Sequence, residues 1–101
     1  MQQEDITIKN AVGLHARPAS IFVQTSNKFS SDIEVEYDKK TANAKSILQI
    51  LSLGVKQGGR ISLKIAGDDE IQALTTLKKL IEEDFGEGKS SEQERKIKEN
   101  Q

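Results

Sequence analysis

The 101-residue sequence contains no cysteine, no tryptophan, one histidine and one proline. The lack of cysteine excludes disulfides, thiol nucleophiles and thiolate metal sites. A single histidine cannot build a histidine-based metal centre, so we expect no metal ion and no cofactor. The length suits one domain with a modest core. A function based on one exposed surface is therefore favoured over a cleft between two lobes.

The sequence also lacks an excess of charge of either sign, since 15 basic residues face 16 acidic ones. It has no general electrostatic attraction for nucleic acid or for an anionic membrane. The first ten residues are polar and acidic, unlike a signal peptide, and no apolar run approaches the roughly 20 residues of a membrane helix. We expect a cytoplasmic protein with no direct nucleic-acid partner and no membrane insertion.

Hydrophobic periodicity predicts four strands and three helices in the order β-α-β-β-α-β-α. A sheet with one alternating apolar face needs helices to cover that face, which predicts an open-faced α+β sandwich. The last helix should place Ile71, Leu74, Leu77, Leu80, Ile81 and Phe85 on one face and end at Gly86. The predicted strands are 5–9, 32–37, 41–44 and 60–65, and the predicted helices are 17–28, 47–53 and 67–85.

The composition changes after Gly86. Residues 87–101 contain one apolar residue, Ile97, and equal numbers of acidic and basic residues. We expect residues 1–86 to form the folded domain and residues 87–101 to form a polar, charged tail that is disordered or a frayed helix extension.

The single histidine stands in the stretch Gly13-Leu14-His15-Ala16-Arg17-Pro18-Ala19, between the first predicted strand and the first predicted helix. Pro18 is suited to the first turn of a helix. The backbone N–H groups of that turn, here those of Ala16 and Arg17, and the helix dipole form a site for an anion. The guanidinium of Arg17 also matches phosphate oxygens. A phosphoryl group carried on His15 would meet all of these groups.

The residues alone leave two interpretations of His15 open, a phosphate-handling histidine and a passive surface histidine. A general base is less favoured, because general bases work beside a nucleophile and an oxyanion site, and the sequence shows neither. An RNA-binding α+β module is also less favoured. Such a module needs exposed aromatic residues and a basic face, whereas this chain has three phenylalanines, one tyrosine and nearly balanced charge.

Two motifs in this sequence resemble those of HPr, the histidine-containing phosphocarrier protein of the bacterial phosphoenolpyruvate:sugar phosphotransferase system. The first is the stretch 13–19 around His15. The second, Asn43-Ala44-Lys45-Ser46-Ile47 with Leu51-Ser52-Leu53-Gly54, resembles the regulatory segment of HPr proteins from Gram-positive and related bacteria. The resemblance extends from about Ile6 to Phe85. It implies an antiparallel sheet with three helices on one face.

The resemblance implies a phosphoryl carrier rather than an enzyme. His15 would accept a phosphoryl group on Nδ1 from phospho-enzyme I and pass it to sugar-specific permease components. Arg17 would stabilise the phosphate, together with the backbone amides of Ala16 and Arg17. A monomer is expected. The alternative within the same family is a regulatory paralogue, either a nitrogen-branch phosphocarrier or a catabolite-repression cofactor; His15 argues against a paralogue that has lost the carrier histidine.

Ser46 has both a structural and a regulatory interpretation. Serine immediately before an apolar helix is a preferred N-cap, and Gly54 suits the end of that helix. By resemblance, Ser46 is also the target of an HPr kinase/phosphorylase, and the phosphorylated form would act with a catabolite-control transcription factor. Phosphorylation there adds roughly two negative charges at a helix start.

A short helix cannot turn all its apolar residues inward, so part of it should form an exposed patch. We predict that Ile50 and Leu53 lie in the core. By resemblance, the docking residues for protein partners are Ser20, Gln24, Ile47, Leu48 and Leu51. The sequence departs from many Gram-positive relatives at Gln49, where they have glycine, and at Leu48 and Leu51, where methionine is common.

Overall fold

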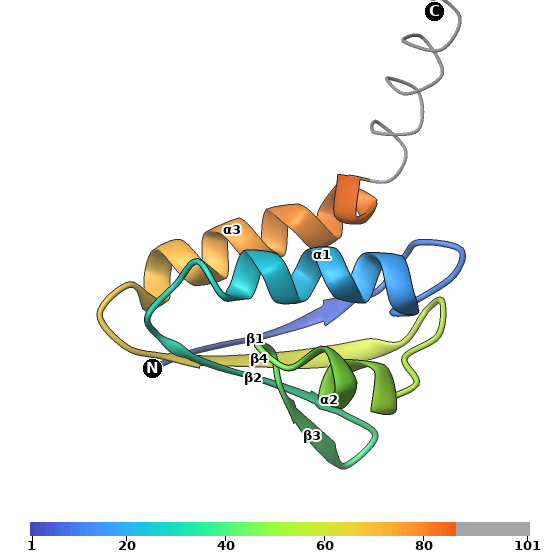
Figure 1. Ribbon diagram of the computed structural model, residues 1–101, viewed down its shortest axis with the longest axis horizontal. Helices are drawn as coiled ribbons and strands as arrows, with labels where there is room; N and C mark the ends of the chain where they lie inside the picture. Colours follow the sequence, from blue (N-terminus) through green and yellow to red (C-terminus); the bar gives the residue numbers. More distant parts are fainter. Residues whose placement is uncertain (87–101) are drawn as a thin grey trace, which may run out of the picture.

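The computed structural model describes residues 1–86, in which four strands form one sheet (Figure 1). The strands follow the order β1-β4-β2-β3, and all neighbours are antiparallel. The order along the chain is the predicted β-α-β-β-α-β-α, with a short 3-10 turn, η1, added at the end. The elements are β1 (Gln2–Thr7), α1 (Ala16–Ser26), β2 (Asp32–Tyr37), β3 (Lys40–Asn43), α2 (Ile47–Ser52), β4 (Arg60–Ala66), α3 (Glu70–Glu82) and η1 (Asp84–Gly86).

The helices leave one face of the sheet open. Helices α1 and α3 run side by side over the same face of the sheet, and α2 packs against α1 and lies beside β3 (Figure 1). The period of two along each strand explains this arrangement, because it places apolar side chains on one face and polar side chains on the other. On β4, Ile61, Leu63 and Ile65 are buried, whereas Ser62 and Lys64 are partly exposed on the opposite face. The predicted fold class is confirmed.

The core joins the strands to the helices through fully buried side chains. Phe22 of α1 and Phe85 of η1 meet edge to face, with ring centroids 6.4 Å apart. Because Phe22 lies on α1 and Phe85 follows α3, this contact fastens the two long helices to each other. Ile50 and Leu53 are 0% and 4% exposed, as predicted.

The structure corrects the predicted bounds of the first strand and the last helix. Strand β1 covers residues 2–7 rather than 5–9, and Ile8 is buried beyond its end. Helix α3 ends at Glu82 because Asp84 and Phe85 adopt positive φ angles of 54° and 58°. This turn redirects the chain so that Phe85 is buried away from the regular helical face.

The predicted apolar face of α3 is also wrong at one residue. Ile71 is 66% exposed, and the buried residues of α3 are Ala73, Leu77 and Ile81. The three buried residues are spaced four apart and so lie on one face of the helix, and Ile71 lies outside that face. The predicted tail, residues 87–101, lies outside the described residues. None of the helices within residues 1–86 is long and apolar enough to cross a membrane.

Candidate functional site

His15 is the N-cap residue of α1. Its backbone is extended, with φ −91° and ψ −169°, and its carbonyl oxygen accepts the first helical hydrogen bond from Ala19 N at 2.9 Å. Within the described residues, its side chain makes no capping hydrogen bond. The imidazole is exposed. It therefore stands at the positive end of an 11-residue helix without being used to cap that helix.

The two residues after His15 bring donors to the same place. Ala16 and Arg17 are exposed residues in the first turn of α1. The N–H groups of a first turn have no acceptor inside their own helix. Pro18, in the same turn, has no N–H and is buried. An anion at this helix end would therefore meet the backbone N–H groups of Ala16 and Arg17 and, by its position, the Arg17 guanidinium.

The loop before His15 is held by the loop that precedes β4. Leu14 is buried and its N–H donates to Val55 O at 2.9 Å. Gly13 has φ +67°, and a Cβ added there would lie 2.3 Å from Val55 O. Only glycine combines this left-handed backbone with so close an approach. Gly13 therefore makes the sharp turn that leads to His15.

Asn10 is a further residue of this loop that was not predicted from the sequence, and its buried side chain donates to Gly13 O at 2.8 Å. The signal was present in Asn10-Ala11-Val12-Gly13, because asparagine at the first position and glycine at the fourth are typical of a β-turn. Gly13 N also donates to Asn10 O at 3.2 Å, which closes that turn. Asn10 therefore organises the loop that carries His15.

Ser46 is the N-cap of α2, as predicted. Its Oγ accepts from Gln49 N at 3.3 Å, and its carbonyl oxygen accepts from Ile50 N at 3.0 Å. The side chain is partly exposed. The serine hydroxyl thus lies at the surface, at the positive end of a six-residue helix, and already has a structural partner.

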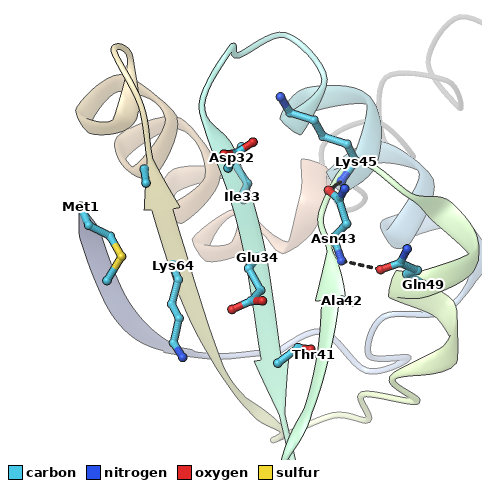
Figure 2. A pocket seen from close by; sticks show the side chains of 11 residues that line it. Met1, Asp32, Ile33, Glu34, Thr41, Ala42, Asn43, Lys45, Gln49 and Lys64 are labelled. Atoms are coloured by element: carbon cyan, nitrogen blue, oxygen red, sulfur yellow. Dashed lines mark hydrogen bonds between the residues drawn. The ribbon is translucent and has the colours of Figure 1, made fainter.

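Gln49 ties α2 to the edge of the sheet. Its Oε1 accepts from the backbone N–H of Asn43, on the edge strand β3, at 2.8 Å (Figure 2). Asn43 in turn accepts from Lys45 N through Oδ1 at 2.9 Å and from Ser46 N through its carbonyl oxygen at 3.0 Å. A glycine at position 49 has no side chain to make this link. Hydrogen bonds between Asn43 and residues both before and after Ser46 therefore hold this segment against β3.

The five predicted docking residues lie on two helices that contact each other, α1 and α2. On α2, Leu48 is 77% exposed, and Ile47 and Leu51 are each 37% exposed. On α1, Gln24 is exposed, Ser20 is partly exposed, and Gln24 Nε2 donates to Ser20 Oγ at 3.3 Å. We call these five residues, Ser20, Gln24, Ile47, Leu48 and Leu51, the docking surface. Its apolar part is the exposed patch that the sequence predicted on the short helix.

Within residues 1–86, no group of three or more histidine, cysteine, aspartate or glutamate side chains is arranged to hold a metal ion. What His15 and its neighbours can do chemically is accept a phosphoryl group on a neutral imidazole nitrogen and bind its oxygens through nearby donors.

Comparison with known families assigns the chain to one of them over most of its length. The family model described as the PTS HPr component phosphorylation site matches residues 2–83. The chain belongs to the PTS HPr family. It is therefore an HPr-family phosphocarrier, and the resemblance found in the two sequence motifs is confirmed over nearly the whole described chain.

Three relatives show how closely this chain follows the family. HPr from Thermoanaerobacter tengcongensis is 57% identical, with a TM-score of 0.83 over 85% of this chain and 97% of that one. HPr from Bacillus anthracis is 43% identical, with a TM-score of 0.74 over 76% and 92% of the two chains. The HPr-like protein Crh of Bacillus subtilis is 42% identical over 84 residues, which are 83% of this chain and 99% of Crh.

The predicted monomer is not confirmed, because relatives of this chain occur as dimers. HPr from Thermoanaerobacter tengcongensis has also been solved as a dimer, which matches this chain at a TM-score of 0.69 over 85% of this chain and 99% of that one. A crystal structure of Crh shows a dimer with a swapped domain, at a TM-score of 0.66 over 83% and 97% of the chains. The monomer stays a prediction.

Proposed function

We propose that this protein carries phosphoryl groups from enzyme I to the sugar-specific permease components of the phosphotransferase system, with His15 as the acceptor. The observation that supports this most is the position of His15 as the exposed N-cap residue of α1, with no capping bond from its side chain among the described residues. Membership of the HPr family supplies the chemical class. The protein would act in the cytoplasm as a carrier, itself a covalent intermediate rather than an enzyme.

The proposed transfer uses the groups at the start of α1. The Nδ1 lone pair of neutral His15 attacks phosphorus, and the N–P bond to His15 forms as the bond between phosphorus and its carrier atom on enzyme I breaks. The electron pair of the broken bond stays with that carrier atom. The backbone N–H groups of Ala16 and Arg17 and the Arg17 side chain would bind the phosphoryl oxygens. The residues of the site are exposed, which suits a group that must leave again.

Incubation with enzyme I and labelled phosphoenolpyruvate tests the proposal. We expect one acid-labile, alkali-stable phosphate per chain in the wild type and none in His15→Ala. Label that persists in His15→Ala would show that another residue is the acceptor. Arg17→Lys, which keeps the charge but not the planar fork, is expected to accept phosphate more slowly than the wild type.

We further propose that phosphorylation of Ser46 regulates this carrier, through an HPr kinase/phosphorylase and a catabolite-control transcription factor. The supporting observation is that Ser46 Oγ lies at the start of α2, directly beside the exposed Ile47 and Leu48 of the docking surface. A phosphate there changes the charge next to the apolar patch by roughly two units. The kinase with ATP should give an acid-stable phosphate that is absent from Ser46→Ala.

The same two assays separate the carrier from the regulatory paralogue. A chain that accepts phosphate at Ser46 but none from phospho-enzyme I would be a catabolite-repression cofactor, as the similarity to Crh, the catabolite repression HPr of Bacillus subtilis, allows. A chain that accepts phosphate from enzyme I and fails to pass it to sugar permease domains would belong to a nitrogen branch. His15 in the exposed N-cap position favours the carrier.

A further inference from the structure

The side chain of Asn10 is buried in the loop between β1 and α1, where it is 6% exposed. Its Nδ2 donates to Gly13 O at 2.8 Å. Its Oδ1 is also buried and finds no hydrogen-bond donor among the described residues. A buried acceptor without a donor opposes folding. An apolar side chain of similar size would remove this unpaired acceptor but would leave Gly13 O without its donor, so the amide gives little net stability here.

The bond from Asn10 acts on one particular peptide unit. Gly13 O and Leu14 N belong to the same planar peptide, which cannot twist internally. Asn10 Nδ2 holds the oxygen of that peptide at 2.8 Å, and Val55 O accepts its N–H at 2.9 Å. The oxygen of this peptide is thus fixed by Asn10 in the same loop, and its N–H is fixed by Val55 in the loop before β4. The following peptide leads directly to His15, so the clamp sets the direction in which the chain enters the N-cap.

We propose that Asn10 is a positioning residue for phosphoryl transfer at His15, acting through the clamped Gly13–Leu14 peptide. The inference rests on the proposed carrier function. Transfer between two proteins requires the imidazole nitrogen to be aligned with the incoming phosphorus, and a displacement on the order of 1 Å can reduce a rate about 100-fold. Loss of one side of the clamp lets the peptide rotate, which moves His15 away from the first-turn donors of α1.

The test compares Asn10→Leu with a matched control at the other end of α1. Asn27 makes the same kind of bond, from Nδ2 to Val23 O at 2.9 Å, far from His15 along the helix. Initial rates of phosphate transfer are measured over a range of phospho-enzyme I concentrations, with the melting temperature of each variant. We expect the maximal rate to fall about tenfold in Asn10→Leu. The maximal rate of Asn27→Leu should stay within about twofold of the wild-type rate, whatever the melting temperature of that variant.

We expect Asn10→Leu to slow phosphate transfer with little change in stability. The substitution removes a favourable bond, but it also removes a buried acceptor that has no donor. The half-saturating concentration of enzyme I should change little, since the docking surface is untouched. Asn10→Ala provides a second variant should leucine not fit. A maximal rate within about twofold of the wild type in folded Asn10 variants, or a loss that merely follows the unfolded fraction, would overturn the inference. A wild type that accepts no phosphate would instead refute the proposed function.

Discussion

Helices α1 and α2 begin at N-cap residues of different kinds. At α2, Ser46 caps its own helix by accepting from Gln49 N. At α1, His15 holds the same N-cap position but its side chain makes no capping bond within the described chain. Serine is among the best capping residues, whereas histidine is not among those preferred. The two helix ends therefore differ in what a phosphoryl group would find there.

This difference predicts different consequences of phosphorylation at the two ends. A phosphoryl group on His15 adds an acceptor where the side chain supplies none, so it can itself bind the first-turn N–H groups. A phosphate on Ser46 replaces a cap that already exists, so its main effect is the new charge beside the docking surface. The N-terminus of α1 is suited to reversible binding of a phosphoryl group. The N-terminus of α2 is suited to a change in the charge of the docking surface.

His15→Asp should have the largest effect and the clearest contrast with α2. Aspartate is a strong N-cap residue and places a negative charge at a helix N-terminus. We expect complete loss of phosphate acceptance from enzyme I, together with a gain of about 1 kcal/mol in the free energy of unfolding. Urea denaturation measures the gain. His15→Ala loses acceptance without that gain, and equal stability of the two variants would contradict the idea that α1 lacks a side-chain cap.

Gly13→Ala tests how tightly the loop before α1 is fixed, with Gly54→Ala after α2 as its control. Both glycines have left-handed backbones, with φ +67° and +65°, but only at Gly13 would a Cβ meet backbone atoms, whereas the space around Gly54 is open. We expect Gly13→Ala to lower the free energy of unfolding by more than about 2 kcal/mol and Gly54→Ala by about 1 kcal/mol. Equal losses by thermal denaturation would contradict the close approach to Val55.

Ser46→Ala measures how much the side-chain N-cap of α2, which α1 lacks, contributes to the free energy of unfolding. The Oγ bond to Gln49 N is long, at 3.3 Å, so the expected loss in the free energy of unfolding is at the low end for an N-cap, about 0.5–1 kcal/mol. Ser52 in the last turn of α2 is a matched control, since its Oγ donates to Gln49 O within the helix. Ser52→Ala should change stability by less than about 0.5 kcal/mol. Equal losses in the two variants would argue against a cap at Ser46.

The fold could be predicted from the sequence because period-two strands and the helix-end residues Pro18, Ser46 and Gly54 are local signals. Signals of the same kind placed His15 and Arg17 at a helix start. The contact of Leu14 with the Val55 carbonyl could not be predicted, because it joins two loops that are far apart in the chain. Asn10 was overlooked although its bond to Gly13 O is local. The prediction misplaced Ile71 because the face that α3 buries depends on tertiary packing.

The start of α3 provides a third N-cap, used in yet another way. Asp69 occupies the N-cap position but, among the described residues, its carboxylate makes no capping bond to its own helix. The carboxylate instead accepts from the hydroxyl of Ser31 and from the backbone N–H groups of Ser30 and Ser31, at 2.9 and 3.0 Å. These bonds, the one from the Ser31 hydroxyl above all, lower the pKa of Asp69 from 3.8 to about 2. Asp69 therefore links the start of α3 to the loop between α1 and β2.

The lowered pKa of Asp69 predicts a pH-dependent contribution to stability. Because the folded protein holds the carboxylate charged down to about pH 2 while the unfolded chain protonates near pH 3.8, the contribution is complete above that pH and is lost as pH falls toward 2. Between these values the wild type should take up as much as about one more proton on unfolding than Asp69→Asn does. Melting temperatures measured from pH 5 to pH 2 should therefore fall more steeply in the wild type. Asp68→Asn, which removes the neighbouring exposed carboxylate, should keep the wild-type slope; a slope that flattens equally in both variants would assign the effect to general charge rather than to the bonds from Ser30 and Ser31.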